Sequence, residues 1–117
     1  MKEDKLKQRT KRFALGVIKL VGTLQRTMEG RAIGKQLIRS GTSVGANYRA
    51  ACRSRSKAEF IAKLGIVEEE ADESAYWMEL IIEGELLDKT RLQPLLDEAN
   101  ELVAIMASSR KSALGRR

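Results

Sequence analysis

The chain has 117 residues, which is enough for one globular domain with its own core and too short for a core plus a separate functional domain. Apolar residues make up 43% and charged residues 32%, as in soluble helical proteins, and the absence of histidine excludes Ser-His-Asp catalysis, the usual zinc sites and Glu-x-x-His di-iron sites. The formal net charge is +6, and residues 1–57 hold 15 of the 22 Lys and Arg residues but only 3 of the 16 Asp and Glu residues.

The first predicted helix covers residues 5–28. Its apolar residues recur at the three-, four- and seven-residue intervals of one helical face, and they are Leu6, Phe13, Val17, Leu20, Leu24 and Met28. Glu29 and Gly30 follow, and a glycine directly after the last apolar position commonly ends a helix. We therefore predict that this helix closes at Gly30.

The second predicted helix covers residues 31–54, although it contains RSGTSVGANYRAAC, which has the small polar residues of a loop. In helical projection, one direction is shared within roughly 40° by Ile33, Leu37, Val44, Tyr48 and Ala51. The opposite direction is shared within roughly 40° by Arg31, Lys35, Arg39, Arg49 and Arg53. A loop does not keep such a phase over twenty residues, so we predict a helix with an apolar face and a basic face, which Arg55 extends.

Two glycines interrupt this second helix. Gly41 and Gly45 each cost about 1 kcal/mol relative to alanine, so their presence needs a compensating gain. Small residues let two helix backbones approach closely, and Ser40 and Asn47 flank the apolar face, where they can donate hydrogen bonds across the contact. We predict a close helix contact, with a ligand site as the alternative.

Two further helices are predicted over residues 57–87 and 91–109, followed by a basic tail over 110–117. Ser56 and Glu59 have the spacing of a capping box at the start of the third helix. The apolar face of this helix consists of Phe60, Leu64, Val67, Ala71, Ser74, Met78, Ile81 and Ile82. The apolar face of the fourth consists of Leu92, Leu96, Ala99, Val103 and Met106.

Two apolar residues of the third helix project away from the centre of its core stripe. Ile66 and Trp77 lie beside acidic residues, and an exposed apolar pair of this kind indicates a subunit interface. The alternative is a wide core-facing stripe that includes both. On the same helix Glu69 and Asp72 have a spacing that would allow a shared cation, but no histidine or facing acidic motif supports a metal site.

Other functional classes lack their motifs. The sequence has no GxxxxGK[ST] or GxGxxG loop for nucleotide phosphates, and no arrangement of nucleophile, acid and base indicates catalysis. We therefore predict no enzyme activity, no cofactor and no metal. No apolar run approaches the roughly 20 residues of a membrane span, the N-terminal segment lacks a signal-peptide pattern and Cys52 is alone, so we expect a cytoplasmic protein.

The stretch RSGTSVGANYRAACRSRSKAEFIAKLGIVEEEADESAYWMELI resembles the signature of a bacterial four-helix-bundle family, which includes proteins encoded in intervening sequences of 23S ribosomal RNA genes. The family is similar to the accessory protein of diversity-generating retroelements, a pentameric bundle that binds nucleic acid and a reverse transcriptase. The resemblance implies an antiparallel up-down bundle, a homopentamer and a possible protein partner of that kind. Many relatives have Ala-Glu-Gly where this chain has Arg49-Ala50-Ala51, so this chain lacks the carboxylate and adds an arginine to the basic face.

Two functions remain open. The first is nucleic-acid binding, RNA or DNA, in which the basic face of the second helix contacts phosphates without reading sequence. The second is an assembly or adaptor module, in which the same arginines pair with the acidic third helix of a neighbouring subunit or partner. We favour the first, because a net charge of +6 cannot be neutralised within the chain.

Overall fold

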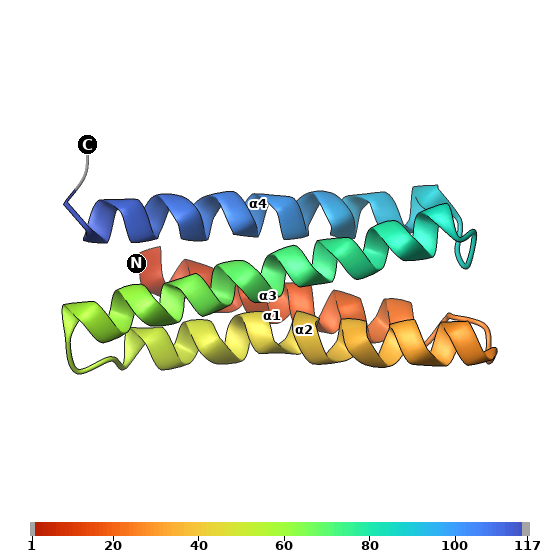
Figure 1. The fold of residues 1–117 in the computed structure, drawn as a ribbon, viewed down its shortest axis with the longest axis horizontal. Coiled ribbons are helices and arrows are strands. Elements are labelled where there is room, and N and C mark those ends of the chain that lie inside the picture. Colours follow the sequence, from red (N-terminus) through yellow and green to blue (C-terminus); the bar gives the residue numbers. More distant parts are fainter. Residues whose placement is uncertain (1, 116–117) are drawn as a thin grey trace.

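The computed structural model describes residues 2–115, which form four α-helices joined by short loops. The helices are α1 (Lys2–Val21), α2 (Met28–Cys52), α3 (Lys57–Glu83) and α4 (Lys89–Ala113). Consecutive helices run in opposite directions, so the start of α1 and the end of α4 lie at the same end of the molecule (Figure 1). Between residues 2 and 115 there is no strand. The predicted all-α, antiparallel up-down four-helix bundle is confirmed.

The four helices surround a common core in the order in which they follow one another along the chain. Helix α2 packs against α1 and α3, and α3 packs against α4. Packing between α1 and α4 is the least extensive of the neighbouring pairs, and the bundle measures 45 × 24 × 22 Å. Because α2 has only α1 and α3 as neighbours, no helix covers its outer side, as Figure 1 shows, and the residues there are exposed to solvent.

The core draws on all four helices. Its largest fully buried apolar side chains are Phe13, Val17, Leu37, Val44, Leu64, Val67, Met78, Ile81, Leu92, Leu102 and Met106. All but one of these belong to the apolar faces predicted from helical spacing. In α4 the spacing favours Val103, whereas Leu102 is fully buried and Val103 is half-buried. The predicted face of α4 is thus displaced by one residue at this point.

The predicted end of the first helix is wrong. Helix α1 ends at Val21, a turn follows, and α2 already begins at Met28. The hydroxyl of Thr27 accepts a hydrogen bond from the backbone N–H of Gly30 at 3.0 Å, which caps the start of α2. Gly30 therefore lies in the first turn of α2 instead of closing α1, and Met28 is 82% exposed instead of continuing the apolar face.

The ends of α3 and α4 differ less from the predicted ends. Helix α3 ends at Glu83, four residues before the predicted end, and the left-handed backbone of Glu85 reverses the chain towards α4. Helix α4 continues to Ala113, so residues 110–113 of the predicted basic tail are helical, and residues 116–117 lie outside the described part. The predicted cap of α3 is confirmed, because the Ser56 hydroxyl accepts a hydrogen bond from the Glu59 N–H at 3.0 Å.

Gly41 and Gly45 lie at a close contact of α2 with α1, as predicted. A Cβ atom on Gly41 would come within 2.8 Å of a methyl group of Val17. One on Gly45 would lie 3.2 Å from the hydroxyl of Thr10, which is itself buried and donates to the carbonyl of Leu6 at 2.8 Å. The absence of side chains at these two positions allows the close approach of the two helices. The prediction that Asn47 donates across a helix contact is wrong, because its amide donates to the carbonyl of Ser43 in its own helix at 2.9 Å.

None of the helices between residues 2 and 115 combines the length and the apolar character that crossing a membrane requires.

Candidate functional site

The six cations predicted to bind nucleic acid are all exposed along or just beyond α2, namely Arg31, Lys35, Arg39, Arg49, Arg53 and Arg55. The four within the helix, Arg31, Lys35, Arg39 and Arg49, point away from the apolar face that α2 buries in the bundle, and Arg53 and Arg55 follow the end of the helix at Cys52. Five of the six form no ion pair with any carboxylate of residues 2–115. Arg39 is the exception.

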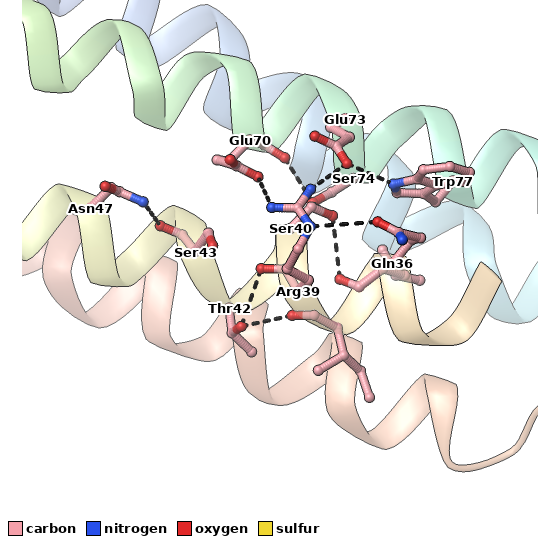
Figure 2. Close-up of polar contacts among 12 residues, drawn as sticks. Gln36, Arg39, Ser40, Thr42, Ser43, Asn47, Glu70, Glu73, Ser74 and Trp77 are labelled. Carbon is pink, nitrogen blue, oxygen red and sulfur yellow. Dashed lines mark hydrogen bonds and ion pairs between the residues drawn. The ribbon is translucent and has the colours of Figure 1, made fainter. Parts of the chain in front are cut away.

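Arg39 bridges two carboxylates of α3. Its guanidinium donates to Glu70 at 3.2 Å and to Glu73, and it lies close to the side-chain oxygen of Gln36 (Figure 2). The hydrogen bond to Glu73 and the nearby carboxylates raise the pKa of Arg39. In turn, the hydrogen bond from Arg39 lowers the pKa of Glu73 below its ordinary value. Arg39 thus links α2 to α3 within one chain.

The predicted basic stripe therefore divides into two parts. Arg39 lies at the edge of α2 that faces α3, where its charge is matched by two carboxylates. Arg49 lies at the edge that faces α1, where it borders a groove together with Lys7 and Lys11. We call the five unpaired cations of this region the α2 basic face, and they are Arg31, Lys35, Arg49, Arg53 and Arg55.

The two predicted interface residues have different surroundings. Ile66 is 40% exposed, whereas Trp77 is half-buried and packs against the core. The indole N–H of Trp77 donates to Glu73 at 3.1 Å, as Figure 2 shows, and its ring meets Tyr76 edge to face with centroids 5.1 Å apart. Trp77 therefore belongs partly to the core-facing stripe of α3, which was the alternative to a subunit interface. An interface at Ile66 and Trp77 stays a prediction.

Several acidic residues that the alternative function needs are already engaged inside the chain. Glu68 accepts a hydrogen bond from Arg110 at 2.7 Å, and Glu70 and Glu73 hold Arg39. The carboxylates of Glu69 and Asp72, which were considered for a metal, form no ion pair within residues 2–115. In that same part of the chain, no three metal-ligating side chains come together.

A further ion pair joins α1 to α4 and was missed from the sequence. Arg9 donates to Glu98 at 2.7 Å and to Glu101 at 2.6 Å, and these hydrogen bonds raise the pKa of Arg9 above its ordinary value. No helix-spacing pattern reveals it, because the partners are 89 and 92 residues apart along the chain. Like Arg39, Arg9 is a basic residue whose charge is matched within the bundle.

The single cysteine has no features of an activated nucleophile. Cys52 is half-buried at the end of α2, and its burial raises the pKa of the thiol. A raised pKa keeps the group protonated at neutral pH, and the neutral thiol is the less reactive form. Its neighbour Tyr48 also has a raised pKa because it is buried. This pair is part of the packing of the bundle.

Comparison with known proteins identifies related chains. The model of the family described as 23S rRNA-intervening sequence protein matches residues 2–108. A crystal structure of a protein with unknown function from the S23 ribosomal protein family of Bacteroides thetaiotaomicron is similar, with a TM-score of 0.87 and 34% sequence identity, covering 95% of this chain and 99% of that one. Among curated proteins there is no significant match. The predicted similarity to the retroelement accessory protein is not shown by these comparisons and stays a prediction.

Proposed function

The chain belongs to the 23S rRNA-intervening sequence protein family, and on that premise we propose that it is a non-catalytic protein that binds nucleic-acid backbones. The α2 basic face contacts phosphates, and it does so without base-specific contacts. The observation that carries this proposal is that five cations of one exposed face have no carboxylate partner in the described chain, while Arg39, on the neighbouring edge, has two.

The mode of binding follows from which side chains are present. Only 4% of residues are aromatic, and the exposed Tyr76 belongs to α3, so few rings are available to stack on unpaired bases. Arginine and lysine bind phosphate oxygens through charge-assisted hydrogen bonds that every sequence offers. We therefore expect affinity for RNA and DNA of arbitrary sequence, with strong dependence on salt.

Assembly is the second part of the proposal. A homo-oligomer, most simply the homopentamer that the family resemblance implies, repeats the α2 basic face and raises the effective concentration of weak binding sites. The predicted interface residues Ile66 and Trp77 on α3, with the exposed Tyr76 packed beside Trp77, offer an apolar surface for such an assembly. A cytoplasmic location and a protein partner such as a reverse transcriptase belong to the same proposal.

The alternative, an adaptor that pairs its basic helix with the acidic helix of a neighbouring copy, has fewer carboxylates available than the sequence indicates. Glu68, Glu70 and Glu73 are already paired with arginines of their own chain. The exposed acidic residues left on α3 for a neighbour are Glu59, Glu69, Asp72, Glu79 and Glu83, of which Glu59 already accepts a hydrogen bond from the backbone N–H of Arg55. The intramolecular pairs thus favour nucleic acid as the partner of the α2 basic face.

A salt titration tests the proposal. The wild-type protein and a variant with all five cations of the α2 basic face changed to Gln are titrated against labelled RNA and DNA of mixed sequence over a series of salt concentrations. The logarithm of the wild-type affinity should fall linearly with the logarithm of salt, with a slope of about −0.9 for each phosphate neutralised on duplex DNA. The variant should lose most of this slope while keeping its mass and helicity. Equal slopes for the two proteins would refute the proposal.

A further inference from the structure

A groove runs between α1 and α2 on the outside of the bundle, and cations from both helices border it. Lys7 and Lys11 come from α1, and Arg49 comes from α2. No carboxylate lines the groove, and none of the three cations forms an ion pair within residues 2–115. Positive charge from two separate helices therefore converges there without an internal counter-ion.

Small side chains keep the groove open. Gly45 and Ala46 line it from α2, and Ala14 lines it from α1. Gly45 forms the floor of the groove, because α1 and α2 are in close contact there and a Cβ atom on Gly45 would lie 3.2 Å from the Thr10 hydroxyl. Since these residues have at most one side-chain carbon, an anion can descend between the longer flanking side chains towards the helix backbones.

The polar atoms of the groove suit an acceptor-rich ligand. The hydroxyl of Thr42 donates to the carbonyl of Ile38 at 2.7 Å and so is occupied by its own helix. The amide of Gln8 has no hydrogen-bond partner in the described chain, so it is free to donate. Two ammonium groups, one guanidinium and the NH2 group of the Gln8 amide can all donate, and a phosphate presents only acceptors along its exposed edge.

We propose that this α1–α2 groove is a phosphate-binding site that receives the backbone of the nucleic acid. The inference rests on the proposed function and deepens it, because it extends the binding surface from α2 to α1 through the shared residue Arg49. It also assigns a binding role to Lys7 and Lys11, which the helical pattern of α2 alone does not reveal. Gln8 adds a neutral donor to the same phosphate.

A matched pair of double variants tests the groove. Lys7→Gln with Lys11→Gln removes the two α1 cations of the groove, and Lys5→Gln with Lys19→Gln removes two from α1 that border other grooves beside α4. Both variants lower the net charge equally. For duplex DNA the first should reduce the slope of log affinity against log salt by about 0.9 for each phosphate that is no longer neutralised, and the second should leave the slope close to wild type.

A steric variant tests the same site without changing charge. Ala46→Leu fills the groove, whereas Ala62→Leu adds the same volume to an exposed position of α3. The first should weaken binding and the second should not, with thermal melts followed by circular dichroism showing that both proteins fold. Together the two comparisons separate the charge of the groove from its shape.

The possible outcomes separate the groove from the proposed function. If the wild type fails to bind at about 50 mM salt, both proposals are refuted. If the wild type binds but each groove variant behaves like its control, the groove is refuted while the function stands. If the Lys7 and Lys11 variant changes the mass of an assembly and leaves binding intact, the groove receives an acidic neighbour and the phosphate proposal is overturned.

Discussion

The hydroxyl of Ser74 on α3 donates a hydrogen bond to the hydroxyl of Ser40 on α2 at 2.9 Å, and both side chains are fully buried. Ser40 in turn lies 3.3 Å from the carbonyl of Leu37, to which it donates (Figure 2 shows the serine pair). Two small polar residues therefore join the helices inside the core, directly beneath the exposed bridge from Arg39 to Glu70 and Glu73. The contact between α2 and α3 therefore contains polar interactions both at the surface and within the mainly apolar core.

Removing either hydroxyl of this pair should destabilise the bundle moderately. Ser40→Ala leaves Ser74 with a partner, because the Ser74 hydroxyl also lies 2.9 Å from the Glu70 carbonyl. We therefore expect a loss of about 0.5–1.5 kcal/mol in the free energy of unfolding, measured by urea denaturation. In a double-mutant cycle with Ser74→Ala the two losses should not add, whereas additive losses would contradict a direct bond between the hydroxyls.

Gly41→Ala should destabilise the protein, although alanine is the better helix former by about 1 kcal/mol. The added Cβ would lie 2.8 Å from Cγ2 and 2.9 Å from Cγ1 of Val17, and overpacking of this kind costs about 1–3 kcal/mol. Gly65→Ala is the matched control, because the nearest atom to its Cβ would be Cδ of Arg110 at 4.0 Å. Urea denaturation should show a loss for the first variant and a gain for the second, and gains in both would refute close packing at Gly41.

The core and the close approach at the glycines were predictable because both depend on a repeat within one helix. The phase of Leu37, Val44 and Tyr48 fixes which side of α2 is buried, and all three are buried. The start of α2 was not predictable in the same way. Thr27 caps the helix by accepting a hydrogen bond from the backbone N–H of Gly30. A capping-box signature would need Glu or Gln at position 30, where this chain has glycine.

The surroundings of the basic residues could not be read from the sequence. A projection of α2 places Arg39 and Arg49 on the same side, but it does not show that α3 lies beside one and α1 beside the other. The pairs of Arg39 with Glu70 and Glu73 span 31 and 34 residues. Such partners depend on which helices become neighbours in the bundle, and the arrangement of the helices, not the periodicity of one, determines this.

Arg39→Gln should raise the pKa of Glu73, because the hydrogen bond from Arg39 is the largest cause of its lowered value. A carboxylate with a lowered pKa in the folded state stabilises the fold above its ordinary pKa of 4.5, and this stabilisation is lost as the pH falls through the lower folded value. The wild type should therefore lose more stability than Arg39→Gln on acidification below pH 4.5. Titration of the Glu73 carboxyl carbon by NMR measures the shift, and Arg31→Gln should leave it unchanged.

Ile66→Lys should weaken assembly without unfolding the chain. Ile66 is 40% exposed on α3, so a lysine can reach solvent in a monomer, but it would place an unpaired charge in an apolar interface. Light scattering should show a lower mass than wild type at micromolar concentration, with the same far-ultraviolet circular dichroism. Ile18→Lys, at an exposed position of α1, is the control and should keep the wild-type mass. A monomeric wild type would contradict the proposed oligomer.

Arg39→Gln and Arg53→Gln should differ in nucleic-acid binding, although both remove one exposed arginine from the region of α2. Arg53 has no carboxylate partner in the described chain, so its charge is available to displace a counter-ion from a phosphate, whereas Arg39 is held by Glu70 and Glu73. On duplex DNA, Arg53→Gln should reduce the slope of log affinity against log salt by about 0.9, and Arg39→Gln should change it little. Equal reductions would mean that Arg39 leaves its two carboxylates to bind phosphate, and the α2 basic face would then include all six cations.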